Sequence, residues 1–274
     1  MSNYEFIVEN MTFSFSRLNY TCLHEFYLNY IECLDGLDNF YGQVGGFCHS
    51  ILEMYAKGEL EIFELATYFE EHYFEYVTEP APFNKYKDLG EDTYYKCLEY
   101  FENIDLLFED YEVLGIEKKV SFEIGGYPMI GYIDLLLRDK KSDDIIIVDH
   151  KLSTLKKLKS GKISKADQQH FIEFKRQTYL YSKAIIEEYG HVDRLKWNMY
   201  KMRDWIEIEW NEDEYNEAIA WASSTINELI KTKEWPPKDS CGPNDFYCHN
   251  LCGQRDNCIY MNEGSEKEWE ESWL

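Results

Sequence analysis

The pattern of apolar and polar positions changes near the middle of the chain, where it takes on the period of β-strands. Residues 118–126 (KKVSFEIGG) alternate in the manner of a half-buried strand, and Gly125 and Gly126 indicate a hairpin turn. Residues 127–139 (YPMIGYIDLLLRD) predict a second strand. Residues 143–153 (DDIIIVDHKLS) contain a continuous apolar run, which is typical of a central strand covered on both faces. Three consecutive strands of one sheet are therefore expected.

Before these strands, apolar residues recur at helical spacing. Helices are expected within 13–34, from about 45 to 57, and over most of 59–111, where the prolines of TEPAPFNKY interrupt the pattern. Ser14 or Ser16 is a suitable N-cap for the first helix.

After the three strands, the pattern predicts elements of both kinds. These are a helix over about 166–189, strands over 195–202 and 205–210, and a helix over about 212–233. Residues 234–258 are irregular and rich in cysteine, and 263–274 form an acidic, weakly ordered tail. The order of elements predicts an α/β mixture around a sheet, with helical additions at the N-terminus.

Composition and charge narrow the possible functions. Hydrophobic residues make up 45% of the 274 residues, which is ample material for a core. The net charge of −24 argues against nucleic acid, because phosphate binding normally requires a basic surface. Residues 151–176 run against this trend, with eight basic residues and two acidic ones. Exposed charges beyond a Debye length of about 8 Å are screened, so this segment, with Lys156, Lys157 and Lys159, is expected to contact phosphate, although most lysine runs are only solvated loops.

The sequence also indicates where in the cell the protein is expected. No apolar run approaches the ~20 residues needed to span a bilayer. The first residues, MSNYEFIVEN, lack the basic and apolar regions of a secretory signal. A cytoplasmic protein without membrane contact is expected, and in that compartment eight cysteines point to metal binding or burial rather than disulfides.

Two carboxylates and a lysine are placed where chemistry could occur. Asp134 lies in the second strand and Asp149 at the end of the third, so the two can meet at one edge of the sheet if the strands are neighbours. Oxygen-rich sites of this kind suit Mg²⁺ or Mn²⁺. Lys151 leaves the same face as Asp149 and can orient a metal-bound water or stabilise charge on phosphate. The alternative is an ordinary solvated strand end.

Three further features favour the functional interpretation. Gly131 lies three residues before Asp134, and glycine inside a strand often marks close approach by another backbone or a ligand. His49 follows two glycines in GGFCH, although a lone histidine is more often a packed core residue. Gln177 and Tyr181 in QTYLY share one helical face that can lie over the lysine.

These motifs together resemble the RecB-like branch of the PD-(D/E)XK nuclease superfamily. GGFCH, GYID, DHK and QTYLY occur in the order and approximate spacing of that branch, over about residues 14–258. The resemblance implies a restriction-endonuclease-like α/β core, a central mixed sheet flanked by helices, with N-terminal helical additions and a C-terminal Cys-rich segment. It further implies a single nuclease domain over 1–262, with a helical part at about 13–111, a catalytic core at about 115–233 and a cluster segment at 241–258.

The resemblance also assigns roles to residues. It implies that His49, Asp134 and Asp149 are metal ligands, with the backbone carbonyl of His150 as a further ligand. Lys151 corresponds to the catalytic lysine. By the same resemblance, Gln177 and Tyr181 position that lysine and contact the DNA strand.

The late cysteines predict a second metal group. Cys241, Cys248, Cys252 and Cys258 lie within eighteen residues and could hold zinc or an iron–sulfur cluster. RecB-like nucleases that carry a cluster are similar in having one early and three late cysteines, which implies a [4Fe–4S] centre on Cys22, Cys248, Cys252 and Cys258. The spacing CHNLC departs from the usual C-x-x-C pair, so zinc on the four late cysteines stays open. Cys33, Cys48 and Cys97 are expected in the core.

The leading hypothesis is a metal-dependent DNA exonuclease acting on single strands or duplex ends, in a recombination, repair, phage or CRISPR-adaptation context. No helicase motif is present, so a helicase or recombination partner would be a separate chain. The alternative is a catalytically silent nuclease-fold module that binds DNA or protein, which the acidic charge favours. A third possibility is a zinc-stabilised interaction domain.

Overall fold

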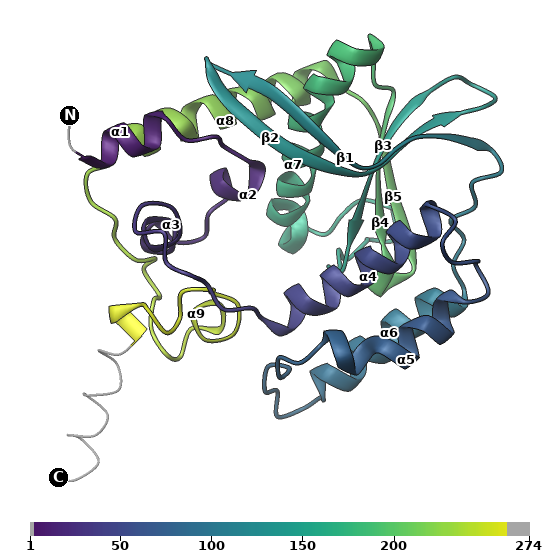
Figure 1. The fold of residues 1–274 in the computed structure, drawn as a ribbon, viewed down its shortest axis with the longest axis horizontal. Helices are drawn as coiled ribbons and strands as arrows, with labels where there is room; N and C mark the ends of the chain where they lie inside the picture. Colours follow the sequence, from purple (N-terminus) through teal and green to yellow (C-terminus); the bar gives the residue numbers. More distant parts are fainter. Residues whose placement is uncertain (1–2, 262–274) are drawn as a thin grey trace.

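The fold is known from a computed structural model that describes residues 3–261 (Figure 1). Its centre is a mixed five-stranded sheet in the order β1-β2-β3-β4-β5. The strands are β1 (Tyr111–Ile124), β2 (Tyr127–Asp139), β3 (Ile145–Lys151), β4 (Arg194–Met199) and β5 (Asp204–Glu209). Only the β3–β4 pair is parallel, and the others are antiparallel. The acidic tail predicted at 263–274 lies outside the described residues.

Helices cover both faces of the sheet. The helical segments are α1 (Asn3–Glu9), α2 (Phe15–Leu18), α3 (Leu23–Tyr30), α4 (Phe40–Ala56), α5 (Leu65–Tyr76), α6 (Leu89–Glu102), α7 (Gln168–Tyr189), α8 (Glu212–Lys231) and α9 (Phe246–Asn250), with short 3₁₀ turns at Lys165–Asp167 and Tyr200–Met202. In Figure 1, α7 and α8 lie on one side of the sheet, whereas α4 crosses the other side with α5 and α6 beyond it. The predicted α/β class and the flanked mixed sheet are confirmed.

Each face of the sheet has its own hydrophobic core. Along β3, Ile145 and Ile147 enter the core beneath α7 and α8, whereas Ile146 and Val148 enter the core beneath α4, α5 and α6. The alternation of a strand sends successive side chains to opposite faces. The continuous apolar run of β3 therefore serves two layers at once, as predicted for a central strand.

Several element boundaries differ from the sequence prediction. The helix expected within 13–34 is split into α2 and α3, because Cys22 adopts an extended backbone between them. Ser14 caps α2 as expected, accepting the N–H of Arg17. Helix α4 begins five residues before Gly45, because the Asn39 side chain accepts the N–H of Gly42 at 2.9 Å and caps it there.

Strand β1 is longer than predicted, and its pairing explains why. It begins at Tyr111 rather than 118, because the long strand β2 pairs with it as far as Asp139. An extra residue near Leu114 forms a bulge in this added part, which breaks the alternation that would have marked it as strand.

No helix within residues 3–261 has the length and apolar character required to cross a membrane.

Gly131 in β2 is where α7 approaches the sheet most closely. A Cβ atom at this position would lie 2.2 Å from Cε1 of Tyr181 on α7. A close approach at this glycine is therefore present, but the approaching group is an aromatic side chain and not the backbone or ligand that was expected.

Replacing Gly131 by alanine should destabilise the fold by about 1–3 kcal/mol, because the methyl group forces the Tyr181 ring out of its place. Urea denaturation measures this loss. Gly46→Ala is the matched control: nothing lies within 4 Å of its Cβ position, so this exposed helical site should gain about 0.5–1 kcal/mol. Equal stability of the Gly131→Ala variant and the parent would contradict the packing described.

Candidate metal centre

Strand β1 changes face at Glu117. Val120 belongs to the core beneath α7 and α8, but Ile116, an even number of residues earlier, packs against the core beneath α4–α6. A regular strand would send both side chains to one face. The backbone of Glu117 produces this change of face. Its φ of 45° lies in the left-handed region that residues other than glycine rarely adopt. The kink turns its carboxylate toward the neighbouring strand.

Strand β2 changes face at Asp134, directly across from that kink. Ile133 enters the α7–α8 core, whereas Leu135 enters the α4–α6 core. The antiparallel register, in which Ile116 pairs with Leu135, places Glu117 opposite Asp134. Side chains at opposed positions are roughly 5 Å apart at Cβ, and like charges there destabilise the sheet. Two acids in this arrangement favour a cation between them.

The third carboxylate belongs to β3. The β2–β3 ladder ends with the pair Leu135 and Val148, so Asp134 and Asp149 follow immediately on neighbouring strands. The strands separate at this point, and the N–H of His150 donates to Oδ2 of Asp134 at 2.6 Å instead of to a strand carbonyl. The end of the ladder thus opens a space that carboxylates line.

Helix α4 contributes His49 from the other face. Its Nε2 lies 2.8 Å from the backbone carbonyl of His150, and because a carbonyl only accepts, Nε2 carries the hydrogen. Nδ1 is left with a free lone pair and faces Oδ2 of Asp134 at 3.6 Å. Single donor atoms of His49, Glu117 and Asp134 all lie within 4.8 Å of one another. One nitrogen and two carboxylate oxygens therefore converge.

Lys151 is held beside Asp149 by contacts on three sides. Its ammonium donates to Oδ1 of Asp149 at 3.0 Å and to Oε1 of Gln177 at 2.9 Å, and lies 5.3 Å from the centre of the Phe174 ring. Oδ2 of Asp149 is 2.8 Å from the same ammonium but receives no aligned hydrogen bond. Burial raises the pKa of Asp149 to about 6; Lys151 opposes that shift and Asp134 adds to it. The buried carboxylate needs more positive charge than one lysine supplies.

Glu117 is subject to the same effect. Burial and, after it, the negative charge of Asp134 raise the pKa of Glu117. Both acids are thus destabilised as anions without a cation, and the donor set of carboxylates, one imidazole and a carbonyl fits a hard divalent ion such as Mg²⁺ or Mn²⁺.

The imidazole of His150 does not face this centre. It is buried, its Nδ1 lies 3.1 Å from the side-chain nitrogen of Asn198, and burial lowers its pKa to about 4. Asn198 also donates to the hydroxyl of Tyr100 at 2.6 Å. The His150 ring also packs edge to face against that of His49 at 5.6 Å, while the backbone N–H and carbonyl of His150 contact Asp134 and His49.

Gln177 and Tyr181 both face the sheet from α7. Gln177 contacts the lysine, and the Tyr181 ring, one helical turn later, lies on Gly131 and is 7% exposed. Burial raises the pKa of the Tyr181 hydroxyl, which lies against Gln177.

The basic residues after β3 divide into two groups. Lys157 donates to Asp204 and to the carbonyl of Trp205, so it fastens its loop to β5. Lys175 and Arg176 pair with acids of α8. Exposed side chains that remain available to a substrate are those of Lys156, Lys159, Lys162 and Lys165.

Five cysteines line one small cavity between the two ends of the described chain. They are Cys22 at the start of α3, Cys248 in α9, and Cys241, Cys252 and Cys258 around it. Figure 1 shows α3 and α9 as neighbours. Burial raises the pKa of the thiols of Cys241 and Cys252. Sγ of Cys241 lies 3.7 Å from that of Cys248, but within residues 3–261 no three of these sulfurs lie within 4.8 Å of one another.

The other three cysteines were expected in the core. Cys48 and Cys97 are fully buried there. Cys33 is exposed, so that expectation was wrong. Helix α3 ends at Tyr30, and Cys33 lies beyond it with a φ of 54°.

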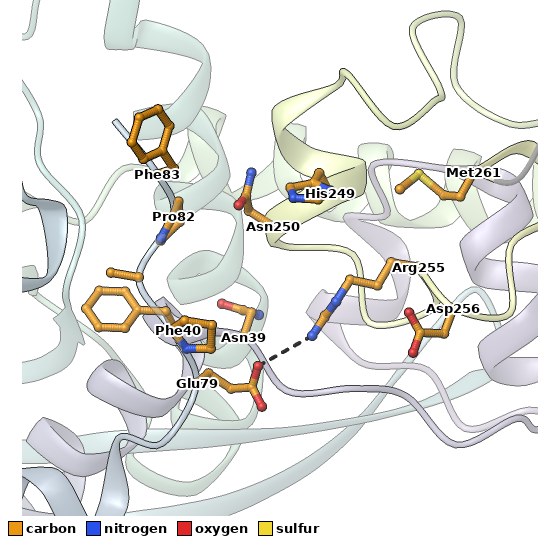
Figure 2. Close-up of a pocket in the computed structure, with 12 residues that line it drawn as sticks. Asn39, Phe40, Glu79, Pro82, Phe83, His249, Asn250, Arg255, Asp256 and Met261 are labelled. Carbon is orange, nitrogen blue, oxygen red and sulfur yellow. Dashed lines mark ion pairs between the residues drawn. The ribbon is translucent and has the colours of Figure 1, made fainter. Parts of the chain in front are cut away.

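One cavity lies apart from the candidate metal centre. It measures about 620 Å³ and lies between the α5–α6 connection and the Cys-rich segment. Figure 2 shows Pro82 and Phe83 on one side of it and His249 on the other, with the ion pair of Arg255 and Glu79 below. None of the carboxylates described above lines it.

Sequence reasoning missed Glu117. Its position between Ile116 and Val120 is where the apolar alternation of β1 changes phase, and this was the available signal. The signal is weak, because a kinked strand looks like a strand end until its partner is known.

The mixed sheet, its flanking helices and the acids at its rim define a restriction-endonuclease-like fold. The family model for the PD-(D/E)XK nuclease superfamily matches residues 12–259, and the chain belongs to that superfamily. Among solved structures, it resembles a "putative exonuclease" from Eubacterium rectale, with 12% identity, a TM-score of 0.49 and 88% of each chain covered. No curated protein matches it.

Removing the charge of Glu117 tests the carboxylate cluster. Glu117→Gln should stabilise the metal-free protein by about 0.2–1 kcal/mol, because it removes a like-charge pair across two strands. The same change should reduce the stabilisation that Mn²⁺ confers, measured as the shift in melting temperature. Glu123→Gln, on an exposed site of the same strand, is the control and should alter neither value. A Glu117→Gln protein that responds to Mn²⁺ like the parent would exclude Glu117 from the site.

Proposed function

We propose that the protein is a metal-dependent DNA exonuclease of the RecB-like type, hydrolysing phosphodiester bonds of single strands or duplex ends. The observation that carries the proposal is the convergence of donor atoms from His49, Glu117 and Asp134, with the ion pair of Asp149 and Lys151 on the next strand. Membership of the nuclease superfamily supports the same reaction class.

The metal would be held by His49, Asp134, Asp149 and the carbonyl of His150, as the resemblance implies, with Glu117 added. A bound Mg²⁺ or Mn²⁺ supplies a Lewis acid and lowers the pKa of a coordinated water. Lys151, held by Gln177, orients that water or stabilises the charge that builds on phosphate. Its ammonium is already placed, so little reorganisation is needed when the substrate binds.

Two groups of residues are proposed to handle DNA. Lys156 and Lys159 are exposed and contact the phosphate backbone beside the centre, with Lys157 holding their loop in place. Tyr181 supports Gln177 from beneath, and its small exposed edge limits it to a peripheral contact with the strand. The overall charge of −24 makes binding weak at high salt, and it favours action with a helicase or recombination partner that delivers the strand.

The cysteine cavity is proposed to hold a [4Fe–4S] cluster on Cys22, Cys248, Cys252 and Cys258. The resemblance supports this set. The 3.7 Å between the sulfurs of Cys241 and Cys248 supports the alternative, a zinc ion on the four late cysteines, because thiolates bound to one zinc ion at about 2.3 Å must lie close together. Bound there, the cluster joins the segment before α3 to the segment around α9.

Lys151→Ala should lower DNA degradation with Mn²⁺ by at least about 100-fold while calorimetry still detects Mn²⁺ binding, because the lysine stabilises charge without ligating metal. Asp149→Ala should abolish both. Lys196→Ala, a partly buried lysine of β4, is the matched control and should cleave like the parent. Undiminished cleavage by both variants would refute the assignment, and metal and DNA binding without cleavage by the parent would favour the silent module.

Metal analysis of anaerobically purified protein tests the cluster. Iron and the visible absorption of an iron–sulfur centre should be present in the parent and lost in Cys22→Ser and Cys252→Ser, because each removes a ligand. Cys241→Ser should keep both, since it lies outside the proposed set. Colourless protein that contains zinc and loses it in Cys241→Ser would instead favour zinc on the four late cysteines.

A further inference from the structure

The helical arm formed by α5, α6 and their connection (65–102) exposes an unusual amount of aromatic surface. Five of the fourteen exposed large hydrophobic side chains of residues 3–261 lie in it: Phe74, Tyr76, Phe83, Tyr86 and Tyr95. Phe83 is 90% exposed and Phe74 is 75% exposed. Contiguous exposed apolar surface on a soluble protein marks an interaction site more often than a random feature.

Part of this surface is shaped into a groove. A cavity of about 540 Å³ runs between α5 and α6, with Phe74, Val77, Tyr94 and Tyr95 among its lining residues. The rings of Phe74 and Tyr94 stack with centroids 5.9 Å apart, and Tyr94 meets Tyr95 edge to face at 5.3 Å. The walls are therefore set by aromatic contacts within the arm and do not depend on an occupant.

The charge around the groove is negative. The arm carries nine acidic residues against three lysines. Glu79 and Glu91 line the groove itself, and Glu91 is exposed, whereas Glu79 pairs with Arg255 at 3.6 Å. This charge opposes a nucleic-acid backbone and suits a basic ligand.

We propose that the groove of the α5–α6 arm binds a basic amphipathic segment of a partner protein. Apolar side chains on one face of a helix enter between Phe74 and Tyr95, and a lysine or arginine beside them meets Glu91. A helix lying in a hydrophobic groove is a common mode of peptide recognition. The groove shares no residue with the metal centre, so an occupant leaves that centre open, and the inference does not depend on the proposed nuclease activity.

The test uses a synthetic helical peptide of lysine and leucine, with leucines at i, i+3, i+4 and i+7. Calorimetry should show tighter binding than for a scrambled peptide of the same composition or for the same peptide with glutamate in place of lysine. Phe74→Ala and Tyr95→Ala should each weaken binding about tenfold, because anchoring aromatics dominate interface energies. Phe63→Ala, a residue that is 78% exposed outside the groove, should bind like the parent.

Further measurements exclude misleading results. Both groove variants alter exposed side chains, so their melting temperatures and DNA cleavage should match the parent. Glu91→Gln should weaken binding and flatten its salt dependence, which a purely apolar contact would not do. Hydrogen exchange should show peptide protection confined to α5, α6 and their connection.

Three results would overturn the inference. One is peptide binding unchanged by Phe74→Ala and Tyr95→Ala. Another is protection of the arm by a single-stranded oligonucleotide and not by the peptide, which would make it a DNA surface. The third is concentration-dependent dimerisation that Phe74→Ala abolishes, which would make a second copy of the chain the occupant.

Discussion

Electrostatic repulsion of Asp134 with Glu117 on one neighbouring strand and with Asp149 on the other is the constraint on which the candidate metal centre depends. Acids at adjacent positions of neighbouring strands repel, and burial makes that repulsion stronger. The fold tolerates the arrangement because Lys151 pairs with Asp149 and the N–H of His150 donates to Asp134. Without a metal ion, such a cluster destabilises the folded protein. A bound divalent cation would neutralise the repulsion.

The two-layered architecture makes this convergence possible. Because β3 is apolar on both faces, helices can pack on both sides and each side can contribute to the same rim. Helix α4 brings His49 from one layer, and α7 brings Gln177 from the other. The small surface of Gly131 lets α7 come close enough for this, since any side chain there would meet the Tyr181 ring. The close packing of α7 on β2 therefore also determines where Gln177 lies relative to Lys151.

Outside the sheet, two accessory regions are attached to different parts of the fold. The cysteine cavity lies where the segment around α3 meets the segment around α9, which hydrogen bonds from Tyr247 to Glu25 and from Gln254 to Asn29 also join. The α5–α6 arm rests on α4 and presents aromatic rings and acids to solvent. Its charge is opposite to that of the exposed lysines after β3. An acidic protein can therefore keep one basic surface for phosphate and another surface for a basic partner.

The sequence alone determined those elements that the hydrophobic pattern of a single segment reveals. The apolar run before Asp149 defined a central strand, the spacing of Asp149 and Lys151 placed both on one face, and Gly131 signalled a close approach. The α/β class followed from the order of such patterns. Those conclusions need only the geometry of one strand or helix.

Tertiary structure decided what depends on register, kinks and side-chain pairing between distant segments. Glu117 reaches the metal centre only because β1 kinks in register with β2, and no local pattern encodes that partner. Lys157 looks equivalent to its neighbours in sequence, yet Asp204 lies within reach and engages it. The meeting of Cys22 with the late cysteines likewise depends on packing of the chain's two ends. A period is a property of one segment, whereas proximity between segments is a property of the whole fold.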